Sequence, residues 1–114
     1  MMPRVSSCEE YFRHVPERFL ADKAEGVDAT FVFDLAGDGG GTWTVTVKNK
    51  TVNVDPGRVE TPSVTYQMKA SDYVDLVNGD LNGVKAVFTR KLKVSGSIGL
   101  AKKMNDFLPP RSGD

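Results

Sequence analysis

The feature that most constrains this chain is the stretch 88–108, which joins a strand-like pattern directly to a helix-like pattern. In residues 91–95, apolar and polar side chains alternate, which is the period of a half-buried strand. Gly96 follows as a strand breaker, and Ser97 as a helix N-cap. In residues 100–108 the apolar side chains recur with a period of 3.6, so they form one stripe on a helix. This stretch predicts a helix that covers an apolar sheet like a lid, and no reactive side chain occupies this lid.

The N-terminal part predicts an amphipathic helix that is interrupted by a proline. Ser7 and Glu10 have the spacing of a capping box, so a helix should start at this point. The apolar residues that follow recur at spacings of three and four. Pro16 removes a backbone donor within this pattern. We therefore expect a break there and a second helical segment through about Ala24, with Gly26 as its stop.

Four runs between the predicted helices alternate between apolar and polar residues and predict strands. They cover residues 30–35, 43–48, 51–54 and 64–70. The glycine-rich loop 37–41 predicts a hairpin between the first two, and the link 48–50 predicts a second turn. The first three strands should therefore form an antiparallel meander that is buried on one face only.

Two short helices are expected after the fourth strand. Ser71 should cap the first, which covers 72–77 and stops at Gly79. Asn82 should cap the second, and its apolar face consists of Val84, Val87 and Phe88. The order of elements is that of an α+β domain with the helices on the apolar face of the sheet. The 114 residues fit one domain, with a core at about 7–108 and a flexible tail at 109–114.

Charge and cysteine content narrow the classes of function. The chain has 15 Lys and Arg against 15 Asp and Glu, so no overall attraction to nucleic acid is expected. Its one cysteine excludes an internal disulfide and suits a reducing compartment. No apolar run approaches the roughly 18 residues of a membrane helix, and the first residues lack the apolar region of a signal peptide. We expect a cytoplasmic protein without a nucleic-acid partner.

Few side chains could carry catalysis or hold a metal. Cys8 and His14 are six residues apart, about 600° around a helix, so they should project from different faces. We expect Cys8 to be a small buried hydrophobe and His14 to face solvent. With one histidine and no Cys-x-x-Cys, no metal site is expected. The loop 37–41 lacks the ending of a phosphate loop. The sequence predicts a binding protein rather than an enzyme.

The order of these motifs resembles the sterol carrier protein type-2 domain, a family of small lipid-binding domains. The resemblance covers about 7–108. Its most specific part is an aromatic residue, then Lys-Leu-Lys-hydrophobic-x-Gly, then a helix starting near Gly-Leu-Ala. Here these are Phe88, 91–96 and 99–101. Arg90 stands where the family commonly has glycine, and a positive φ at this position would make arginine a source of strain.

The resemblance implies a five-stranded, mostly antiparallel sheet, helices over one face and an apolar tunnel between them. It implies a sterol, fatty acid or fatty acyl-CoA as ligand, and neither a cofactor nor a catalytic residue. The side chains expected to line the tunnel are Phe12, Val15, Phe19, Phe31, Phe33, Trp43, Val45, Leu76, Val84, Val87, Phe88, Leu92, Leu100, Ala101, Met104, Phe107 and Leu108. For each of them, an ordinary core position without a cavity is the alternative.

Other partners and functions stay open at this point. A modest basic cluster is either a solvated face or a site of transient attraction to anionic lipid headgroups. It consists of Arg90, Lys91, Lys93, Lys102 and Lys103. One alternative function is an interaction or dimerisation module with a dry core, which an exposed Trp43 or a stable dimer would favour. A second is an enzyme acting on a lipid, which would require Cys8 or His14. We expect a monomer or a weak dimer.

Overall fold

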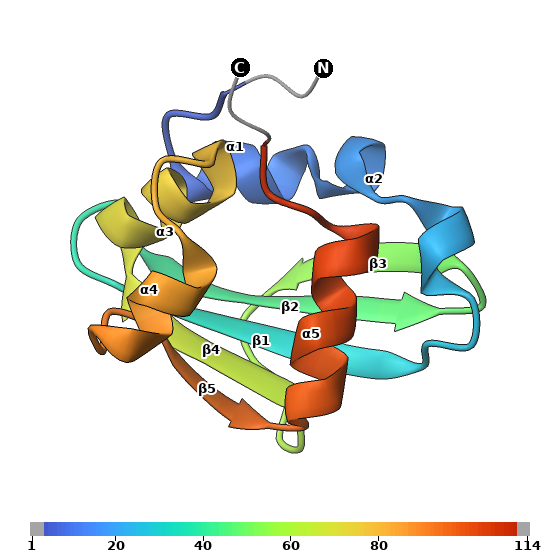
Figure 1. Cartoon of the computed structure of the whole chain (residues 1–114). Helices are drawn as coiled ribbons and strands as arrows, with labels where there is room; N and C mark the ends of the chain where they lie inside the picture. Colours follow the sequence, from blue (N-terminus) through green and yellow to red (C-terminus); the bar gives the residue numbers. More distant parts are fainter. Residues whose placement is uncertain (1–3, 112–114) are drawn as a thin grey trace.

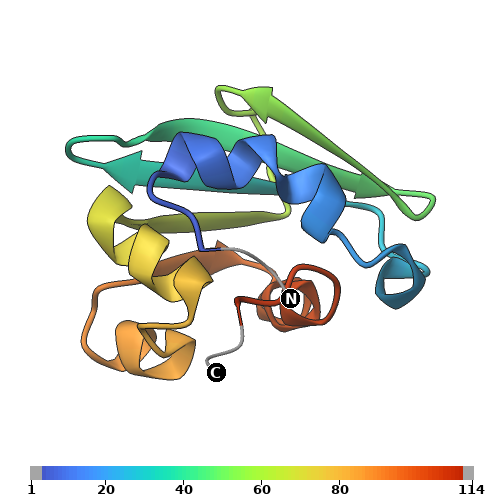
Figure 2. The same cartoon turned by 90° about the horizontal axis from the view of Figure 1, so that it is seen from above.

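A computed structural model describes residues 4–111, in which five strands form one sheet and the helices lie against one of its faces (Figures 1 and 2). The strands are β1 (Ala29–Ala36), β2 (Gly41–Lys48), β3 (Thr51–Pro56), β4 (Val64–Lys69) and β5 (Lys93–Gly96). Their order in the sheet is β3-β2-β1-β4-β5. The pair β1–β4 is parallel and the other neighbouring pairs are antiparallel. The predicted α+β fold with a five-stranded, mostly antiparallel sheet is confirmed.

The helices are α1 (Cys8–Arg13), α2 (Val15–Arg18), the 3-10 helix η1 (Ala21–Ala24), α3 (Ala70–Asn78), α4 (Gly83–Phe88) and α5 (Ile98–Phe107). The predicted cap of α1 is present, since the Ser7 hydroxyl accepts a hydrogen bond from the Glu10 N–H at 3.1 Å. The break around Pro16 is also present, because α1 ends at Arg13 and α2 carries this proline in its first turn. The expectation of one segment through Ala24 is wrong, since α2 stops at Arg18 and η1 is separate.

For the helices after β4, the sequence predicted three N-caps and one C-terminal stop, and three of these four predictions are confirmed. Gly79 ends α3 with a φ of 87°. The Asn82 side chain caps α4 by accepting from two backbone N–H groups, and the Ser97 hydroxyl caps α5 by accepting from the Leu100 N–H at 3.2 Å. The Ser71 cap is wrong: β4 runs directly into α3, which starts at Ala70, and no side chain caps it.

The last strand is shorter at its start than the alternation predicted. The N–H groups of Lys91 and Leu92 donate to the Ala86 carbonyl at 2.8 and 3.0 Å. These bonds tie both residues to α4, so β5 starts at Lys93. Arg90, which precedes them, has a φ of 63°. Arg90 therefore adopts the left-handed conformation that favours glycine, the residue commonly found at this position in the family, and the expected backbone strain is present.

The inner face of the sheet carries the core, and the outer face is not simply exposed. Val32 and Thr44 are buried, although the meander was expected to be buried on one face only. The connection 57–63 crosses the outer face and covers them, since the Thr44 hydroxyl donates to the Gly57 carbonyl at 2.7 Å. This crossing also allows β4 to run parallel to β1.

The apolar face of α4 does not pack on the sheet, contrary to our expectation. Val84, Val87 and Phe88 are exposed by 71%, 50% and 85%, and of the residues of α4 only Ala86 is buried. The sequence correctly predicted an apolar face on this helix, but the face points to solvent and not to the sheet. The exposed face is part of the candidate site described below.

Both ends of the described chain are tied to α3. The side chain of Asn78 accepts from the Val5 N–H at 2.8 Å and donates to the Val5 carbonyl at 2.9 Å. The Arg111 N–H donates to the Val77 carbonyl at 2.8 Å. The expected flexible tail was 109–114, but the chain is held as far as Arg111, and residues 112–114 lie outside the described residues. No helix within the described part is long and apolar enough to span a bilayer.

Candidate ligand-binding pocket

A pocket of about 950 Å³ lies between the sheet and four of the helices. It is lined by side chains from β1, β4 and β5 below and from α1, α3, α4 and α5 above, with the segments 79–83 and 108–111 at its side. Its volume is at the upper end of the ~300–1,000 Å³ that small-molecule sites occupy. The lining is mainly apolar, and the pocket lies between the sheet and the helices.

Aromatic side chains form the inner wall of the pocket. Phe33 stacks on Tyr66 with ring centroids 4.8 Å apart, and it lies 5.6 Å from Tyr73. Tyr73 in turn meets the edge of Tyr11 at 5.4 Å. Burial raises the pKa of all three tyrosine hydroxyls, so they are neutral at physiological pH. The wall therefore offers uncharged polar groups within an apolar surface.

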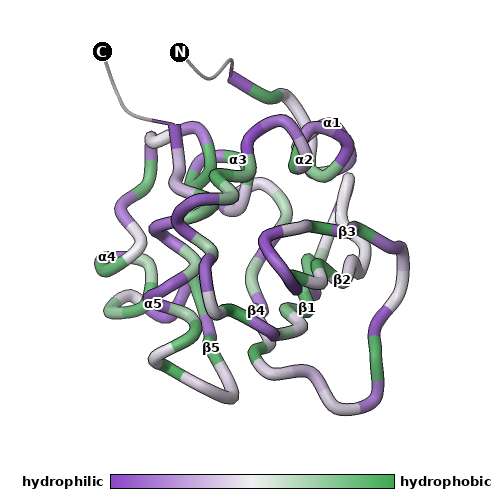
Figure 3. Tube along the Cα trace, turned by 90° about the vertical axis from the view of Figure 1, so that its right-hand side faces the viewer, coloured by the Kyte–Doolittle hydropathy of each residue, from purple (hydrophilic) through white to green (hydrophobic). Residues whose placement is uncertain are grey.

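The opposite side of the pocket is an apolar mouth that faces solvent. The described residues leave six large apolar side chains exposed, and four of these line the pocket. The four are Val84, Val87, Phe88 and Ile98. A side chain that lines a pocket and is at least half exposed must lie at its opening, so α4 and the start of α5 form the mouth. Figure 3 shows α4 at the edge of the molecule, away from β2 and β3.

The structure brings together nine of the seventeen side chains that the sequence placed in the site. Those that line the pocket are Phe33, Leu76, Val84, Val87, Phe88, Leu92, Ala101, Met104 and Leu108. The other eight belong to the packed core or pack against it: Phe12, Val15, Phe19, Phe31, Trp43, Val45, Leu100 and Phe107. In this half of the domain the space is filled, because Phe12 stacks on Trp43 at 4.6 Å and Phe107 meets Phe31 at 5.9 Å.

The sequence reasoning missed the three tyrosines, although two of them carried a signal. Tyr66 occupies an apolar position of the alternating strand, and Tyr11 widens the apolar stripe of α1. The third, Tyr73, lies in α3, where no pattern singled it out. No local pattern indicates that these three side chains share one wall. Tyr11 comes from α1, far from the other two in the sequence, and Tyr66 and Tyr73 come from a strand and a helix whose relative direction the sequence does not give.

A buried arginine lies against the pocket wall. Arg18 is 5% exposed, and one of its terminal nitrogens donates to the Val77 carbonyl at 3.4 Å. Its guanidinium carbon lies 5.0 Å from the centroid of the Tyr11 ring. The other two guanidinium nitrogens have no hydrogen-bond partner. Tyr11 and Val77 both line the pocket, so this positive charge, which has no acidic partner among residues 4–111, is located beside it.

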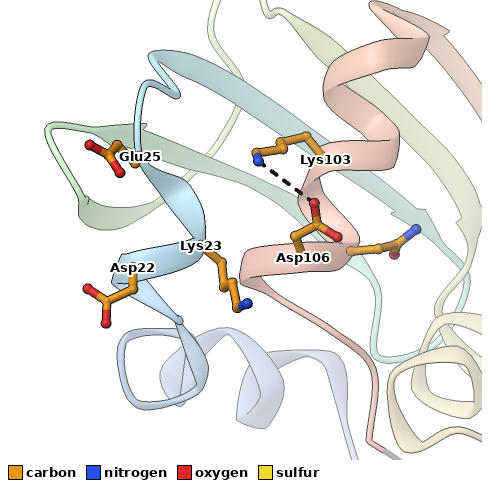
Figure 4. A pocket seen from close by; sticks show the side chains of 6 residues that line it. Asp22, Lys23, Glu25, Lys103 and Asp106 are labelled. Atoms are coloured by element: carbon orange, nitrogen blue, oxygen red, sulfur yellow. Dashed lines mark ion pairs between the residues drawn. The ribbon is translucent and has the colours of Figure 1, made fainter.

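A second cleft, of about 710 Å³, lies between η1 and α5 and is polar (Figure 4). It is lined by Asp22, Lys23, Glu25, Lys103, Asn105 and Asp106. Lys103 and Asp106 form an ion pair at 3.8 Å within it. With charges of both signs and little apolar surface, this cleft does not suit a lipid.

The two reactive side chains lie away from the pocket lining. Cys8 is buried as expected, its thiol donates to the Ala70 carbonyl at 3.5 Å, and burial raises its pKa, which keeps the thiol neutral. His14 is partly exposed and its Nδ1 lies 2.8 Å from a Glu17 carboxylate oxygen. Among residues 4–111, no group of three or more histidine, cysteine or acidic side chains could hold a metal ion.

Comparison with known proteins places this geometry in a family. The family model of the SCP-2 sterol transfer family matches residues 9–109. Human hydroxysteroid dehydrogenase-like protein 2 is 33% identical over 107 residues, which cover 93% of this chain and 26% of that protein. Human sterol carrier protein 2 is 37% identical over 90 residues, covering 79% of this chain and 16% of that protein. The chain thus spans about a quarter of the length of the first curated relatives it matches.

Solved structures agree with this assignment. The sterol carrier protein domain 2 of Helicoverpa armigera has a TM-score of 0.71 at 31% identity, covering 85% of this chain and 81% of that one. The palmitated SCP2L2 of Aedes aegypti has a TM-score of 0.71 at 22% identity, covering 96% and 100%. The sec-alkylsulfatase Pisa1 of Pseudomonas sp. has a TM-score of 0.76 at 20% identity, covering 99% and 17%. The last two likenesses show the fold alone. On the match over 9–109 and on the shared fold, this chain belongs to the SCP-2 sterol transfer family.

Proposed function

We propose that this chain binds a sterol, a fatty acid or a fatty acyl-CoA in the apolar pocket and passes it on. Membership in the family supports lipid binding or transfer in general. The observation that carries the proposal is the pocket itself: about 950 Å³, mainly apolar, with an aromatic inner wall and a mouth open to solvent. An apolar tunnel for the body of the ligand is part of this proposal.

Desolvation supplies the binding energy in this account. A ligand that buries ~300 Å² of apolar surface gains ~7–8 kcal/mol at ~25 cal/mol per Å². Loss of translational and rotational freedom takes several kcal/mol back. A net affinity of micromolar or weaker follows, since micromolar binding corresponds to about 8 kcal/mol. The shape of the pocket sets selectivity more than individual polar contacts do. The palmitated state of the Aedes aegypti neighbour makes palmitate the first ligand to test.

We further propose that the chain binds its ligand without catalysis. The thiol of Cys8 is neutral and donates to a backbone carbonyl, so it is a poor nucleophile. The described residues that line the pocket include neither a cysteine nor a histidine. Turnover of a bound lipid that is lost on substitution of Cys8 or His14 would overturn this part of the proposal.

Substitution of Met104 tests the proposed function. Met104 lines the pocket from α5 and is 7% exposed, so Met104→Asp places a charge in the apolar surface. We expect uptake of a fluorescent fatty acid to be lost while the far-UV circular dichroism of the sheet is kept. Val59→Asp is the matched control, because Val59 lies in the 57–63 connection and is 38% exposed. Unchanged uptake by Met104→Asp would contradict the proposed site.

A second candidate function is an interaction or dimerisation module with a dry core. The exposed face of α4 favours it, because exposed apolar patches mark protein contacts as well as ligand sites. Trp43 does not add to this surface, since it is partly buried and stacked on Phe12. Sedimentation velocity distinguishes the two: a stable dimer that takes up no lipid would favour the module.

A further inference from the structure

The basic residues of this electrically balanced chain are concentrated in the segment that forms the mouth of the pocket. Residues 81–105 contain six basic side chains and no aspartate or glutamate. The six are Lys85, Arg90, Lys91, Lys93, Lys102 and Lys103, and all are exposed. The rest of the chain therefore carries nine basic and 15 acidic residues, an excess of negative charge. A neutral net charge conceals a strongly positive segment.

The same segment carries the exposed apolar side chains. Val84, Val87, Phe88 and Ile98 all lie within 81–105, and Phe88 is 85% exposed. Several cations are close to these side chains in the sequence. Lys85 lies on α4, Arg90 and Lys91 follow this helix after Thr89, and Lys102 lines the pocket beside Ala101. An exposed apolar helix with adjacent lysines and arginines is the composition of an interfacial membrane anchor.

We propose that α4 and the start of α5 dock the pocket mouth on a phospholipid bilayer that contains anionic lipids. Phe88 and Val84 enter the boundary between headgroups and acyl chains. The cations on and next to these elements, Lys85, Arg90, Lys91 and Lys102, contact anionic headgroups. This inference rests on the proposed function, because docking serves the transfer of a lipid between the membrane and the pocket. With the mouth on the bilayer, a lipid moves between membrane and pocket without exposing its apolar body to water.

Charge complementarity favours a bilayer over a second copy of the chain. Two copies that met through this face would bring two sets of cations together, and like charges across an interface oppose association. An anionic bilayer offers the opposite charge and an apolar interior in the same place. Each lysine or arginine near such a surface contributes attraction that is equivalent to roughly fivefold in affinity, and salt screens it.

Vesicle binding tests the proposal directly. The probes are vesicles of phosphatidylcholine alone and of phosphatidylcholine with 30 mol% phosphatidylglycerol, measured by co-sedimentation at low and at high salt. We expect binding to the anionic vesicles only, and weakening by salt. Phe88→Ala should weaken binding by on the order of tenfold, because a phenylalanine side chain no longer enters the bilayer. Lys85→Glu with Lys91→Glu should weaken it by at least as much.

Matched controls separate docking from the total charge of the protein. Lys23→Glu with Lys48→Glu makes the same change in charge at η1 and at the end of β2, on the far side of the molecule from α4 in Figure 1. These variants should bind the anionic vesicles nearly as well as the unchanged protein. Equal losses in both double variants, or equal binding to neutral vesicles, would overturn the proposal. A dimer that Phe88→Ala dissociates would also overturn it and assign the face to a second copy.

A fluorescent reporter locates the contact. In a Trp43→Phe background, Phe88→Trp provides a single tryptophan on α4, and Val59→Trp provides one on the 57–63 connection. Anionic vesicles should shift the emission of the first to shorter wavelength and leave the second unchanged. Uptake of a fluorescent fatty acid from solution is measured in parallel. If the double variant Lys85→Glu with Lys91→Glu keeps both uptake and vesicle binding, the docking proposal is contradicted and the proposed function is not. If the unchanged protein takes up no fatty acid, the proposed function is contradicted instead.

Discussion

The guanidinium carbon of Arg18 lies 5.0 Å from the centroid of the Tyr11 ring, in the interior of the domain. Two nitrogens of this guanidinium have no hydrogen-bond partner, and no acidic side chain forms an ion pair with it among the described residues. A buried charge without a partner is costly, and it attracts an anion in its neighbourhood. Tyr11 lines the pocket, so this charge favours a ligand with an acid group.

Arg18→Met should therefore separate acidic from neutral ligands. Methionine fills similar apolar space without the charge. We expect the affinity for palmitate to fall by on the order of tenfold, from loss of a charge interaction in a medium of low dielectric constant. The affinity for hexadecanol, which has the same chain and no charge, should stay the same. Isothermal titration with both ligands is the measurement, and equal losses for the two would contradict the role of the charge.

The stability of the same variant gives an independent check. Because Arg18→Met removes an unpartnered buried charge, the free energy of unfolding of the ligand-free protein should rise by about 1 kcal/mol. Arg13→Met is the control, since Arg13 lies on the exposed side of α1 and forms an exposed ion pair with Glu9 at 3.3 Å. We expect the free energy of unfolding to change by no more than about 0.5 kcal/mol in this control. A large loss of stability in Arg18→Met would show that Arg18 has a partner.

Gly96 and Gly99 should respond to alanine with opposite signs. Gly96 has a φ of 98°, and a Cβ there would lie 2.3 Å from the Ser63 carbonyl oxygen, so Gly96→Ala should destabilise by several kcal/mol. At Gly99, in the first turn of α5, the nearest atom to such a Cβ is the Ser97 hydroxyl at 3.9 Å. Gly99→Ala should stabilise by about 0.5–1 kcal/mol. Urea unfolding measures both, and similar values for the two variants would contradict the close approach of β5 to Ser63.

The Asn78 side chain should account for much of the attachment of the N-terminal segment. It is buried and makes both possible backbone hydrogen bonds to Val5. Asn78→Ala leaves the Val5 N–H and carbonyl unsatisfied, which should lower the free energy of unfolding by about 1–3 kcal/mol. Hydrogen exchange at the Val5 amide should accelerate as well. Asn53→Ala, on the exposed side of β3, is the control and should change stability by no more than about 0.5 kcal/mol.

The exposed ion pair between Arg4 and Asp80 gives a prediction for acid pH. Hydrogen bonding to Arg4, together with its charge, lowers the pKa of Asp80 below the usual 3.8. A depressed pKa means that the pair stabilises the fold above pH 3.8 and that this stabilisation is lost as pH falls through the folded pKa. An NMR titration of the Asp80 carboxyl should have its midpoint below 3.8, and Arg4→Ala should move it upward. An unchanged midpoint in Arg4→Ala would contradict the pairing.

Local signals in the sequence were sufficient for most elements of the fold. Side-chain caps at Ser7, Asn82 and Ser97 and the alternation of the strands predicted where helices and strands lie. These signals depend on neighbours within a few residues, which is why they can be read from one sequence. The failures were of another kind. Ser71 has the chemistry of a cap, but α3 begins one residue earlier, directly after β4.

The pocket could be predicted only in part because periodicity identifies an apolar face but not what lies opposite it. Phe12 and Phe33 occupy equally apolar positions in the sequence. Phe12 nevertheless packs against Trp43 in the core, while Phe33 lines the pocket. The parallel pairing of β1 with β4, which brings Phe33 beside Tyr66, has no local signature. The apolar face of α4 has the same pattern that a buried helix would have. Only the three-dimensional structure shows that it points to solvent.

The measurement that tests the central claim most directly is native mass spectrometry of the purified protein, followed by solvent extraction of whatever co-purifies. Lipid binding in the pocket predicts a mass shift of one lipid per chain, with a fatty acid, a sterol or a fatty acyl-CoA in the extract. The shift should disappear in Met104→Asp and persist in Val59→Asp. Protein without bound lipid, which also takes up no fluorescent fatty acid in a saturable manner, would contradict the account and favour a dry interaction module.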